Sequence, residues 1–598
     1  MSIAELKKVT LCGLLKEKHE ILEGLQALGC MHLLPLRPPP DEVEKVASPR
    51  ADAAYKALAF LSDVPQKRRQ VVRDPRFDVA RLTEDVLELK QRLREATDRR
   101  DFLAHRIAAV EPWGDIDFPP HGALAGFRLW FYVLPLGKLD ALKSVKLPWQ
   151  IVRRDHRFAY LVLISKEEPP SDVLPIPRTH TGALPLGELS AQLEEAEIEI
   201  EDLIGQRQAL TRYIYLLSLN LAEAENRASL THAEQQTRDD HAVVAVQGWV
   251  PADAIADVVS YAEDKKLACL IEDPGPEDTP PTLIQQPEDM EAGVDLTMFY
   301  QVPGYRSWDP TIVLVASFSI FFAMILADAG YGLILMAGLV LFWRRLGESR
   351  KGRAYRRFGL LLFGCTIVYG VMVGSYFGVA PPEDSLPGRL HVLSVNDFDT
   401  MMKLSVVIGV IHIGLGNAMT AYINRSKLSA LSSLGWIAAI MGGLLIWLGP
   451  PETVWSRAGP ILVAGGLLAV LLFSSERPVR KPTDHLWRLV DGVQRLSGIM
   501  GAFGDVLSYM RLFALGLASA SLAVTFNGLA KDAYSALPGL GLLAAVLIIV
   551  IGHMLNLALS LISGVVHGLR LNFIEFYKWG LPEEGTPYRK FTRKEVEP

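Results

Sequence analysis

Polar residues recur at helical spacing within the last two long apolar segments, residues 494–529 and 544–575. In the last segment the steps alternate between three and four, through His553, Asn556, Ser560, Ser563, His567 and Arg570. At about 100° and 1.5 Å per residue, these six share an arc of roughly 100° and extend about 25 Å along one helix. The preceding segment places Gln494, Ser497, Asp505, Ser508 and Ser519 on a similar arc, with Arg511 beside it. Because unpaired polar groups are costly in hydrocarbon, such stripes favour a function at membrane depth.

Arg511 and Arg570 need the most explanation, because a guanidinium group stays charged wherever it is placed. Arg570 is near a helix end, so it is open to a simpler interpretation, in which its side chain reaches toward lipid headgroups. The alternative is an ion path in which a fixed cation faces a titrating carboxylate. For any single serine or asparagine of the stripes, hydrogen bonding between packed helices explains the residue equally well.

Composition separates a soluble part from a membrane part. The chain has 598 residues, of which 50% are hydrophobic and 21% charged, and nearly all long apolar runs follow Asp309. A net charge of −6 gives no basic surface for nucleic acid. The four cysteines lack metal-ligand spacing and are interpreted as reduced thiols of a cytosol-facing protein, so we expect no metal and no cofactor. The N-terminus lacks an apolar region with a cleavage site, so no signal peptide is expected.

The first 272 residues predict a two-lobed α/β arm. Strands are expected at 7–14, 30–36, 127–134, 149–154, 159–165, 241–250 and 269–272, and helices at 16–28, 51–62 and 252–264. Heptad-spaced apolar residues over 79–110 and 189–221 predict two long helices on either side of a distal lobe at about 113–185. The simplest arrangement is a dumbbell bridged by an antiparallel coiled coil, although simple helix packing produces the same pattern. Residues 273–308, rich in proline and acid, are expected to form a linker.

The remainder predicts a membrane domain at 309–578 and a basic cytosolic tail at 579–598. Seven apolar runs are present, and the first is interrupted by ADAGYG, which contains Asp328. If the N-terminal arm is cytosolic, the cationic segment 343–357 must be cytosolic too, which requires two crossings before it. The prediction is therefore eight transmembrane helices with both termini cytoplasmic. Asp328 is favoured as a residue of a helix hairpin, with a place on an ion route as the alternative, and His412 and Asn417 are expected to be structural.

Three segments carry a family resemblance: 309–332, 503–523 (FGDVLSYMRLFALGLASASLA) and 567–577 (HGLRLNFIEFY). They resemble the membrane subunit of V/A-type rotary ATPases, called subunit a in eukaryotes and subunit I in prokaryotes. The resemblance covers the whole chain, and the length is similar to the prokaryotic form. It implies a stator in a prokaryotic cell membrane, with two ion half-channels beside a rotating proteolipid c/K/L ring whose subunits carry buried carboxylates. It also implies peripheral-stalk E/G-type subunits, a central-stalk d/C-type subunit and, indirectly, soluble ATPase subunits A and B.

The motifs also assign residues. Arg511 matches the family's essential arginine, Arg570 its partner, and His567 and Glu575 fall on motif positions. Ser519 and Ser560 stand where eukaryotic members have a histidine and a carboxylate, so the resemblance does not extend to a relay built on those two groups. The predicted ion-translocation residues are Arg511, Arg570, His567, Glu575, Ser508, Ser519, Asn556, Ser560, Ser563 and Asp505.

No nucleotide site is predicted, because GxxxxGK[ST] is absent and LGKLD at 136–140 lacks its first glycine and last hydroxyl. ATP chemistry would therefore belong to other subunits. The sequence leaves the ion open between H⁺ and Na⁺. Two alternatives also stand: a self-contained secondary transporter with a cytosolic regulatory domain, which predicts internal membrane repeats, and a purely structural membrane anchor.

Overall fold

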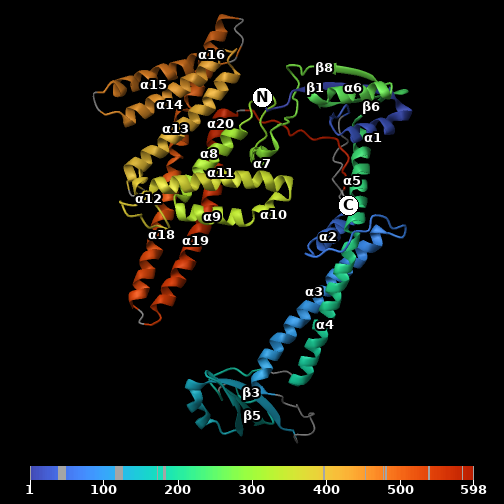
Figure 1. The fold of residues 1–598 in the computed structure, drawn as a ribbon, viewed down its shortest axis with the longest axis vertical. Coiled ribbons are helices and arrows are strands. Elements are labelled where there is room, and N and C mark those ends of the chain that lie inside the picture. The colour runs from blue at the N-terminus through green and yellow to red at the C-terminus, as the bar shows by residue number, and fades with distance from the viewer. Residues whose placement is uncertain are drawn as a thin grey trace. The chain divides into compact units, whose positions relative to one another are not determined.

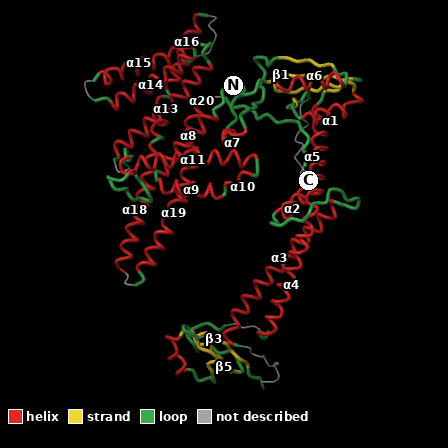
Figure 2. The backbone as a smooth tube through the Cα atoms, viewed as in Figure 1, coloured by secondary structure: helices red, strands yellow, loops and turns green. Residues whose placement is uncertain are grey.

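The computed structural model describes residues 2–37, 49–114, 126–170, 173–179, 184–394, 397–450, 453–475, 477, 481–536, 539–581 and 583–596. The chain divides into two compact units. The first unit comprises Met1–Leu15, Leu28–Leu34 and Asp239–Phe591, and the second comprises Lys16–Ala27, Pro35–Arg238 and Thr592–Pro598. Strands occur in two sheets, and helices make up most of the remainder (Figure 2).

In the first unit, residues from both ends of the N-terminal arm form one antiparallel sheet. Its strands are β1 (Leu6–Leu14), β2 (His32–Leu34), β6 (Arg238–Asp240), β7 (Val243–Pro251) and β8 (Ala268–Glu272). The order is β2-β7-β1-β8, with β6 also paired to β7, and Leu6 lies opposite Pro251. Gly248 allows β2 to approach β7, because a Cβ atom there would lie 2.6 Å from the His32 carbonyl oxygen. Helix α6 (Ile255–Asp264) connects β7 to β8.

The same unit contains the apolar helices. Five helical stretches are long and apolar enough to cross a membrane: Arg350–Val373, Phe398–Ile423, Ala430–Leu448, Thr483–Ala536 and Gly541–Gly580. Three shorter apolar helices accompany them, at Thr311–Leu326, Ala329–Leu341 and Arg457–Phe473. The elements of this region are α8 (Thr311–Leu326), α9 (Ala329–Leu341), α10 (Trp343–Gly347), α11 (Arg350–Val373), α12 (Leu386–Arg389), α13 (Phe398–Ile423), α14 (Ala430–Leu448), α15 (Val454–Phe473), α16 (Pro482–Leu496), α17 (Ile499–Leu507), α18 (Met510–Ala536), α19 (Gly541–Arg570), the π-helical η7 (Leu571–Phe576) and α20 (Tyr577–Gly580). A membrane-spanning protein is therefore indicated, and the number of eight crossings stays a prediction.

Asp328 closes a tight hairpin between α8 and α9. Ala327 adopts a left-handed conformation (φ 49°), which ends α8, and Asp328 caps α9 by accepting a hydrogen bond from the Tyr331 N–H. The same carboxylate accepts hydrogen bonds from the N–H groups of Phe377 and Gly378 and from the Ser375 hydroxyl, at 2.7 to 3.0 Å. Asp328 is only 3% exposed. These contacts are those of a residue that closes a helix hairpin, which is the role favoured for Asp328 from the sequence.

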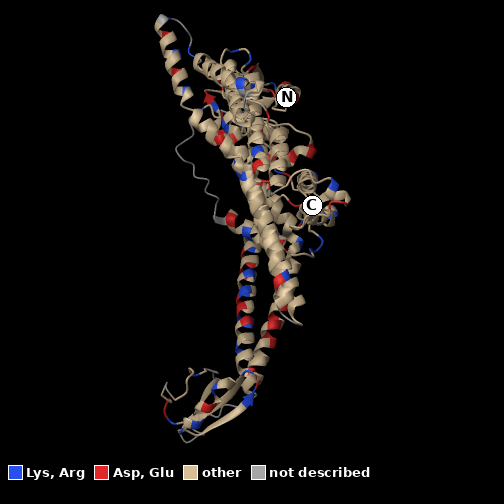
Figure 3. Ribbon diagram, turned by 90° about the vertical axis from the view of Figure 1, so that its left-hand side faces the viewer, with Lys and Arg blue, Asp and Glu red and all other residues tan. Residues whose placement is uncertain are grey.

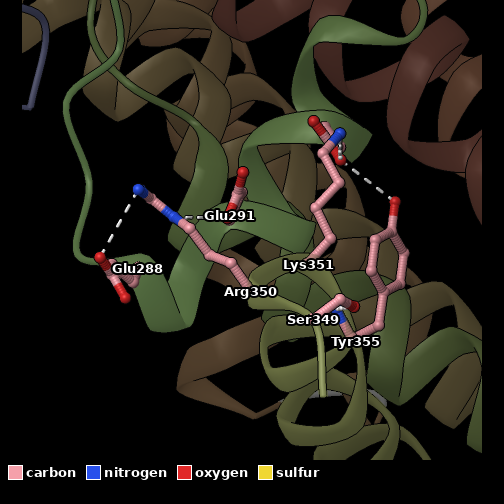
Figure 4. Close-up of polar contacts among 8 residues, drawn as sticks. Glu288, Glu291, Ser349, Arg350, Lys351 and Tyr355 are labelled. Carbon is pink, nitrogen blue, oxygen red and sulfur yellow. Dashed lines mark hydrogen bonds and ion pairs between the residues drawn. The ribbon is translucent and has the colours of Figure 1, made fainter. Parts of the chain in front are cut away.

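The segment expected to be a linker is folded along part of its length. It contains η6 (Glu288–Met290) and α7 (Glu291–Met298). Arg350, at the start of α11, faces Glu291 and Glu288 (Figure 4), and its nitrogen atoms lie 3.3 and 3.5 Å from their carboxylate oxygens. Lys351 lies 3.3 Å from Asp295. Each exposed pair contributes little by itself, but together they hold acidic 288–295 against the cationic start of α11.

In the second unit, two long helices pack along their lengths. α3 (Val79–Val110) and α4 (Leu186–Leu210) lie side by side (Figure 1), with Leu89, Ala96 and Leu203 in one buried cluster and Leu103, Val110, Leu189 and Ala196 in another. Charged residues are frequent along the pair and sparse on the membrane-length helices (Figure 3). The chain between α3 and α4 forms a three-stranded sheet, order β3-β5-β4, from β3 (Arg128–Pro135), β4 (Trp149–Arg154) and β5 (Phe158–Ser165). The other helices are α1 (Lys18–Leu28), α2 (Pro49–Ser62) and α5 (Ile214–Gln236).

One predicted element is divided. The heptad run 189–221 predicts a single returning helix, but a 3-10 turn at Thr211–Tyr213 separates α4 from α5. The fully buried Thr211 explains the division, because its hydroxyl donates to the Gln208 carbonyl (2.6 Å) and accepts the Arg68 N–H (2.9 Å). The segment 494–529 is divided as well, into parts of α16, α17 and α18.

Candidate functional site

The break between α17 and α18, at Ser508–Tyr509, ends two residues before Arg511. Tyr509, at the break, is fully buried, and its hydroxyl is 2.8 Å from Nδ1 of His412 on α13. Gly409 of the same helix lets the ring approach, because a Cβ atom there would lie 2.7 Å from the Tyr509 ring. The ring of His412 also stacks on Phe576 at 4.2 Å. These contacts fix the start of α18 and so the position from which Arg511 extends, which gives His412 the structural role expected for it.

Arg511 faces Glu575. Its Nη1 atom is 3.8 Å from Oε1 of Glu575, whose side chain is 3% exposed against 23% for Arg511. Glu575 lies in η7, and π-helical segments occur frequently at functional sites. This segment is anchored by Asn572, whose side-chain oxygen accepts the Ser317 hydroxyl of α8 at 2.6 Å. Arg511 Nη1 and Glu575 Oε2 are both buried and lack hydrogen-bond partners among the described residues, so the pair retains capacity for another polar partner.

Two further predicted residues come close to this pair. Arg570, in the last turn of α19, is exposed, and its charge acts on Arg511. His567 lies close enough to Arg511 and Arg570 for both charges to act on its ring. Its Nδ1 atom is buried and has no hydrogen-bond partner in the described part of the chain. We call Arg511, Glu575, Arg570 and His567 the arginine cluster. It combines permanent positive charge, one buried carboxylate and one imidazole.

A second group of polar residues joins α9, α18 and α19. The Tyr331 oxygen lies 2.7 Å from Nδ1 of His553 and accepts the Asn556 amide at 2.9 Å. That amide also donates to the Ser519 carbonyl oxygen at 2.9 Å. The chain of contacts is completed by Ser519 Oγ to Ser560 Oγ (2.8 Å), Ser560 Oγ to Asn556 Oδ1 (3.4 Å) and His553 Nε2 to Asn527 Oδ1 (3.0 Å). We call this hydrogen-bonded chain of six residues the hairpin-side chain. The hairpin in this name is the α18–α19 pair, and the six residues lie nearer to its connection than Arg511 does.

Three other predicted site residues, Asp505, Ser508 and Ser563, belong to neither of these two named groups. Asp505 accepts hydrogen bonds from Lys578 Nζ (2.7 Å) and Trp579 Nε1 (2.8 Å), which gives it a structural contact to α20. Ser508 donates to the Gly504 carbonyl of its own segment, and its hydroxyl also lies close enough to act on the Glu575 carboxylate of the arginine cluster. Ser563 is half-buried on α19 between Ser560 and His567.

Three residues of the hairpin-side chain were missing from the predicted site. His553 belongs to the α19 stripe and was identifiable from its spacing. Asn527 is on α18, eight residues after Ser519. Tyr331 comes from ADAGYG on α9, so no periodicity within the last two helices points to it. Asn417, expected to be structural, donates to the Ile413 carbonyl of its own helix.

These features define a class of protein: a polytopic α-helical membrane protein that holds a fixed arginine and a buried carboxylate among its apolar helices. Over most of its length the chain is similar to subunit I of V- and A-type ATP synthases, which confirms the resemblance predicted from the motifs. It is 26% identical to the V-type ATP synthase subunit I of Chlamydia pneumoniae over 603 residues, covering 87% of each chain. Identity is 23% over 615 residues to that of Borreliella burgdorferi, covering 99% of each.

The A-type ATP synthase subunit I of Methanocaldococcus jannaschii is 25% identical over 443 residues, covering 66% of this chain and 61% of the relative. No family model matches the chain. Among solved structures, the cytoplasmic N-terminal domain of a subunit I homologous to subunit a of V-ATPase aligns with 44% of this chain and 99% of its own, at 17% identity and a TM-score of 0.22. A score this low carries no argument about the fold.

Proposed function

We propose that this chain is the stator membrane subunit of a V/A-type ATPase or ATP synthase, in which Arg511 faces the carboxylates of a rotating proteolipid ring. The observation that carries the proposal is the pairing of half-buried Arg511 with buried Glu575 at 3.8 Å, in a cluster that keeps unused hydrogen-bonding capacity. The similarity to V- and A-type subunits I over most of the chain supports it.

The chemistry follows from charge. A ring carboxylate in lipid is stable when neutralised by a proton or sodium ion, and an adjacent guanidinium group stabilises the ionised form instead. Arg511 therefore promotes ion release while it remains charged itself. Glu575 serves as its counter-ion between passing ring carboxylates, so the charge of Arg511 is never left wholly unpaired. Each elementary charge that crosses 100 mV involves about 2.3 kcal/mol, so several transfers are coupled to each ATP.

The remaining parts have supporting roles in this proposal. Eight crossings with both termini cytoplasmic place the α18–α19 connection on the outer side of a prokaryotic cell membrane. The arginine cluster then lies toward the cytoplasmic side, and the hairpin-side chain belongs to the outer half-channel. The N-terminal arm, with α3 and α4 as its coiled-coil bridge, binds E/G-type peripheral stalks, and a d/C-type subunit links the ring to the ATPase subunits A and B.

The test compares Arg511→Ala, Arg511→Lys and Arg495→Ala in the complex reconstituted into vesicles. Arg495 is an exposed arginine in the last turn of α16 and serves as the matched control. We expect Arg511→Ala to assemble but to abolish ATP-driven ion uptake, Arg511→Lys to retain little, and Arg495→Ala to pump like the wild type. Undiminished uptake by Arg511→Ala refutes the role and favours the structural anchor. Uptake by the isolated chain without ring or ATPase subunits favours a self-contained transporter.

A further inference from the structure

His412 on α13 contacts both of the elements that carry the central pair of the arginine cluster. Its Nδ1 atom lies 2.8 Å from the hydroxyl of Tyr509, which is two residues before Arg511. Its ring stacks on Phe576, the residue directly after Glu575, with the ring centroids 4.2 Å apart and the ring planes 9° apart. One side chain therefore links the start of α18 to the π-helical segment η7.

The helix surface around His412 is shaped to receive both partners. Gly409 and Gly416 lie three residues before it and four residues after it, and so on the same face of α13. An added Cβ atom would lie 2.7 Å from the Tyr509 ring at Gly409 and 3.3 Å from the Phe576 ring at Gly416. Because Tyr509 and Phe576 are also fully buried, neither ring can move without disturbing close packing. α13 is thus a fixed surface against which both rings are placed.

The contacts of the His412 ring favour a positional role over a role in carrying ions. Its Nε2 atom is buried and has no hydrogen-bond partner among the residues that the structure describes. The ring of Phe321 on α8 packs against it edge to face, with the centroids 5.1 Å apart. A proton taken up at Nδ1 would therefore find no second polar group in the described part of the chain to which it could move.

We propose that His412 is a positioning residue for ion translocation, which sets the distance between Arg511 and Glu575 by holding Tyr509 and Phe576. The inference rests on the proposed stator function. Arg511 Nη1 is 3.8 Å from Glu575 Oε1, which is longer than a hydrogen bond. The pair is therefore close but not locked together, so the guanidinium group stays available to a ring carboxylate. A shift of about 1 Å would lock the pair or separate it, and misplacements of that size can cost about a hundredfold in rate.

The experiment compares His412→Phe, Tyr509→Phe, the double variant of these two and His412→Gln in the complex reconstituted into vesicles. Each single phenylalanine leaves one buried hydrogen-bonding partner unpaired, whereas the double variant replaces both partners with apolar groups, which is close to neutral for stability. Glutamine keeps an acceptor for the Tyr509 hydroxyl and a planar group to stack on Phe576, but it does not titrate. Tyr369→Phe is the matched control, because this buried α11 hydroxyl has no hydrogen-bond partner in the described residues.

ATP-driven ion uptake per assembled complex and the midpoint of thermal unfolding are measured for each variant. We expect both single phenylalanine variants to lower the midpoint. The double variant should restore the midpoint while its uptake stays at least about tenfold below the wild type, because stability returns but the hydrogen bond that orients Tyr509 does not. His412→Gln should retain most of the uptake, and Tyr369→Phe should pump like the wild type.

A purely structural role of His412 predicts that uptake follows the midpoint, so wild-type uptake by the double variant overturns the inference. Equal loss of uptake in His412→Gln and His412→Phe, with His412→Gln melting like the wild type, overturns it as well, because the imidazole itself is then required. If either the double variant or His412→Gln does not assemble, the other decides. If Arg511→Ala is inactive while the double variant pumps normally, this inference alone fails; if Arg511→Ala pumps normally, the stator function fails.

Discussion

Substitutions of Asp328 can distinguish a structural role of its carboxylate, in closing the α8–α9 hairpin, from a role on an ion route. Its side chain receives three backbone N–H groups and the Ser375 hydroxyl, and only 3% of it is exposed. Asp328→Ala leaves four donors unpaired, at about 1–3 kcal/mol each for the two in buried hydrogen bonds (Tyr331 N–H and Ser375 Oγ–H) and less for the two in part-buried ones (Phe377 N–H and Gly378 N–H). The expected loss, roughly 4–8 kcal/mol, is comparable to a whole domain's stability. Asp328→Asn keeps one acceptor oxygen and replaces the other with a donor that opposes Gly378 N–H, for a loss of about 1–3 kcal/mol.

Asp397→Ala is the control. Asp397 also caps a helix, accepting the Thr400 N–H at 3.2 Å, but it is exposed, so its loss should cost about 1 kcal/mol. Thermal unfolding of the purified protein, followed by tryptophan fluorescence, measures the order Asp328→Ala, Asp328→Asn, Asp397→Ala from lowest to highest midpoint. An Asp328→Ala midpoint equal to that of Asp397→Ala refutes the hairpin role. If Asp328→Asn melts like Asp397→Ala yet loses ion uptake, Asp328 belongs to the ion route instead.

Three further predictions follow from packing and protonation. Gly370→Ala should lower the midpoint of thermal unfolding, because the added Cβ atom would lie 2.2 Å from the Ala329 backbone nitrogen. The control Gly364→Ala, whose Cβ atom would meet nothing within 4 Å, should leave the midpoint unchanged or slightly higher. Leu203→Ala, in the α3–α4 contact, should cost about 2–5 kcal/mol in the free energy of unfolding, and exposed Ile204→Ala under about 0.5 kcal/mol, both measured by denaturant titration. Burial lowers the pKa of His32, whose neutral ring accepts the Arg589 N–H at 2.9 Å. The contribution of this hydrogen bond to the docking of 586–591 is therefore present in full above a pH of about 6.5 and is lost as the pH falls through the lowered pKa. Hydrogen exchange at pH 7.5 and 5.0 should show weaker protection at the lower pH, and His32→Asn should remove the pH dependence.

Much of the local structure was predictable because its causes are local. The predicted strand 149–154 and helix 79–110 match β4 and α3. Alternating and heptad-spaced apolar residues identify these elements because the spacing is set by which face of the strand or helix is buried. The interruption at 211–213 was not predictable, because it depends on Thr211 contacting Arg68, far away in sequence. The break at Ser508–Tyr509 depends similarly on His412. Helical periodicity carries no information about such partners.

The site divides in the same way. Ser519, Asn556 and Ser560 were predicted from their spacing, and they do meet; Asp505 was on the same arc, but Lys578 and Trp579 hold it elsewhere. A polar stripe indicates that a helix face has polar neighbours, but it does not identify the residues that contact it. Tyr331 illustrates the limit, because its two partners come from a helix more than two hundred residues later.

The two polar groups of the membrane region differ in how fully their hydrogen bonds are satisfied, and that difference bears on mechanism. In the hairpin-side chain, each amide and hydroxyl has a partner. In the arginine cluster, Arg511 Nη1, Glu575 Oε2 and His567 Nδ1 are buried and lack partners among the described residues. Buried polar atoms left unpaired cost about 1–3 kcal/mol each, so a sequence selected only for stability would remove them. Single unpaired atoms also occur elsewhere in the described membrane region, at Tyr369 Oη, His412 Nε2 and Tyr577 Oη, but in the arginine cluster three of them belong to a cation, a carboxylate and an imidazole that lie close together. In the stator proposed above, the missing partner of this cluster would be a ring carboxylate that arrives and departs with each step of the rotor.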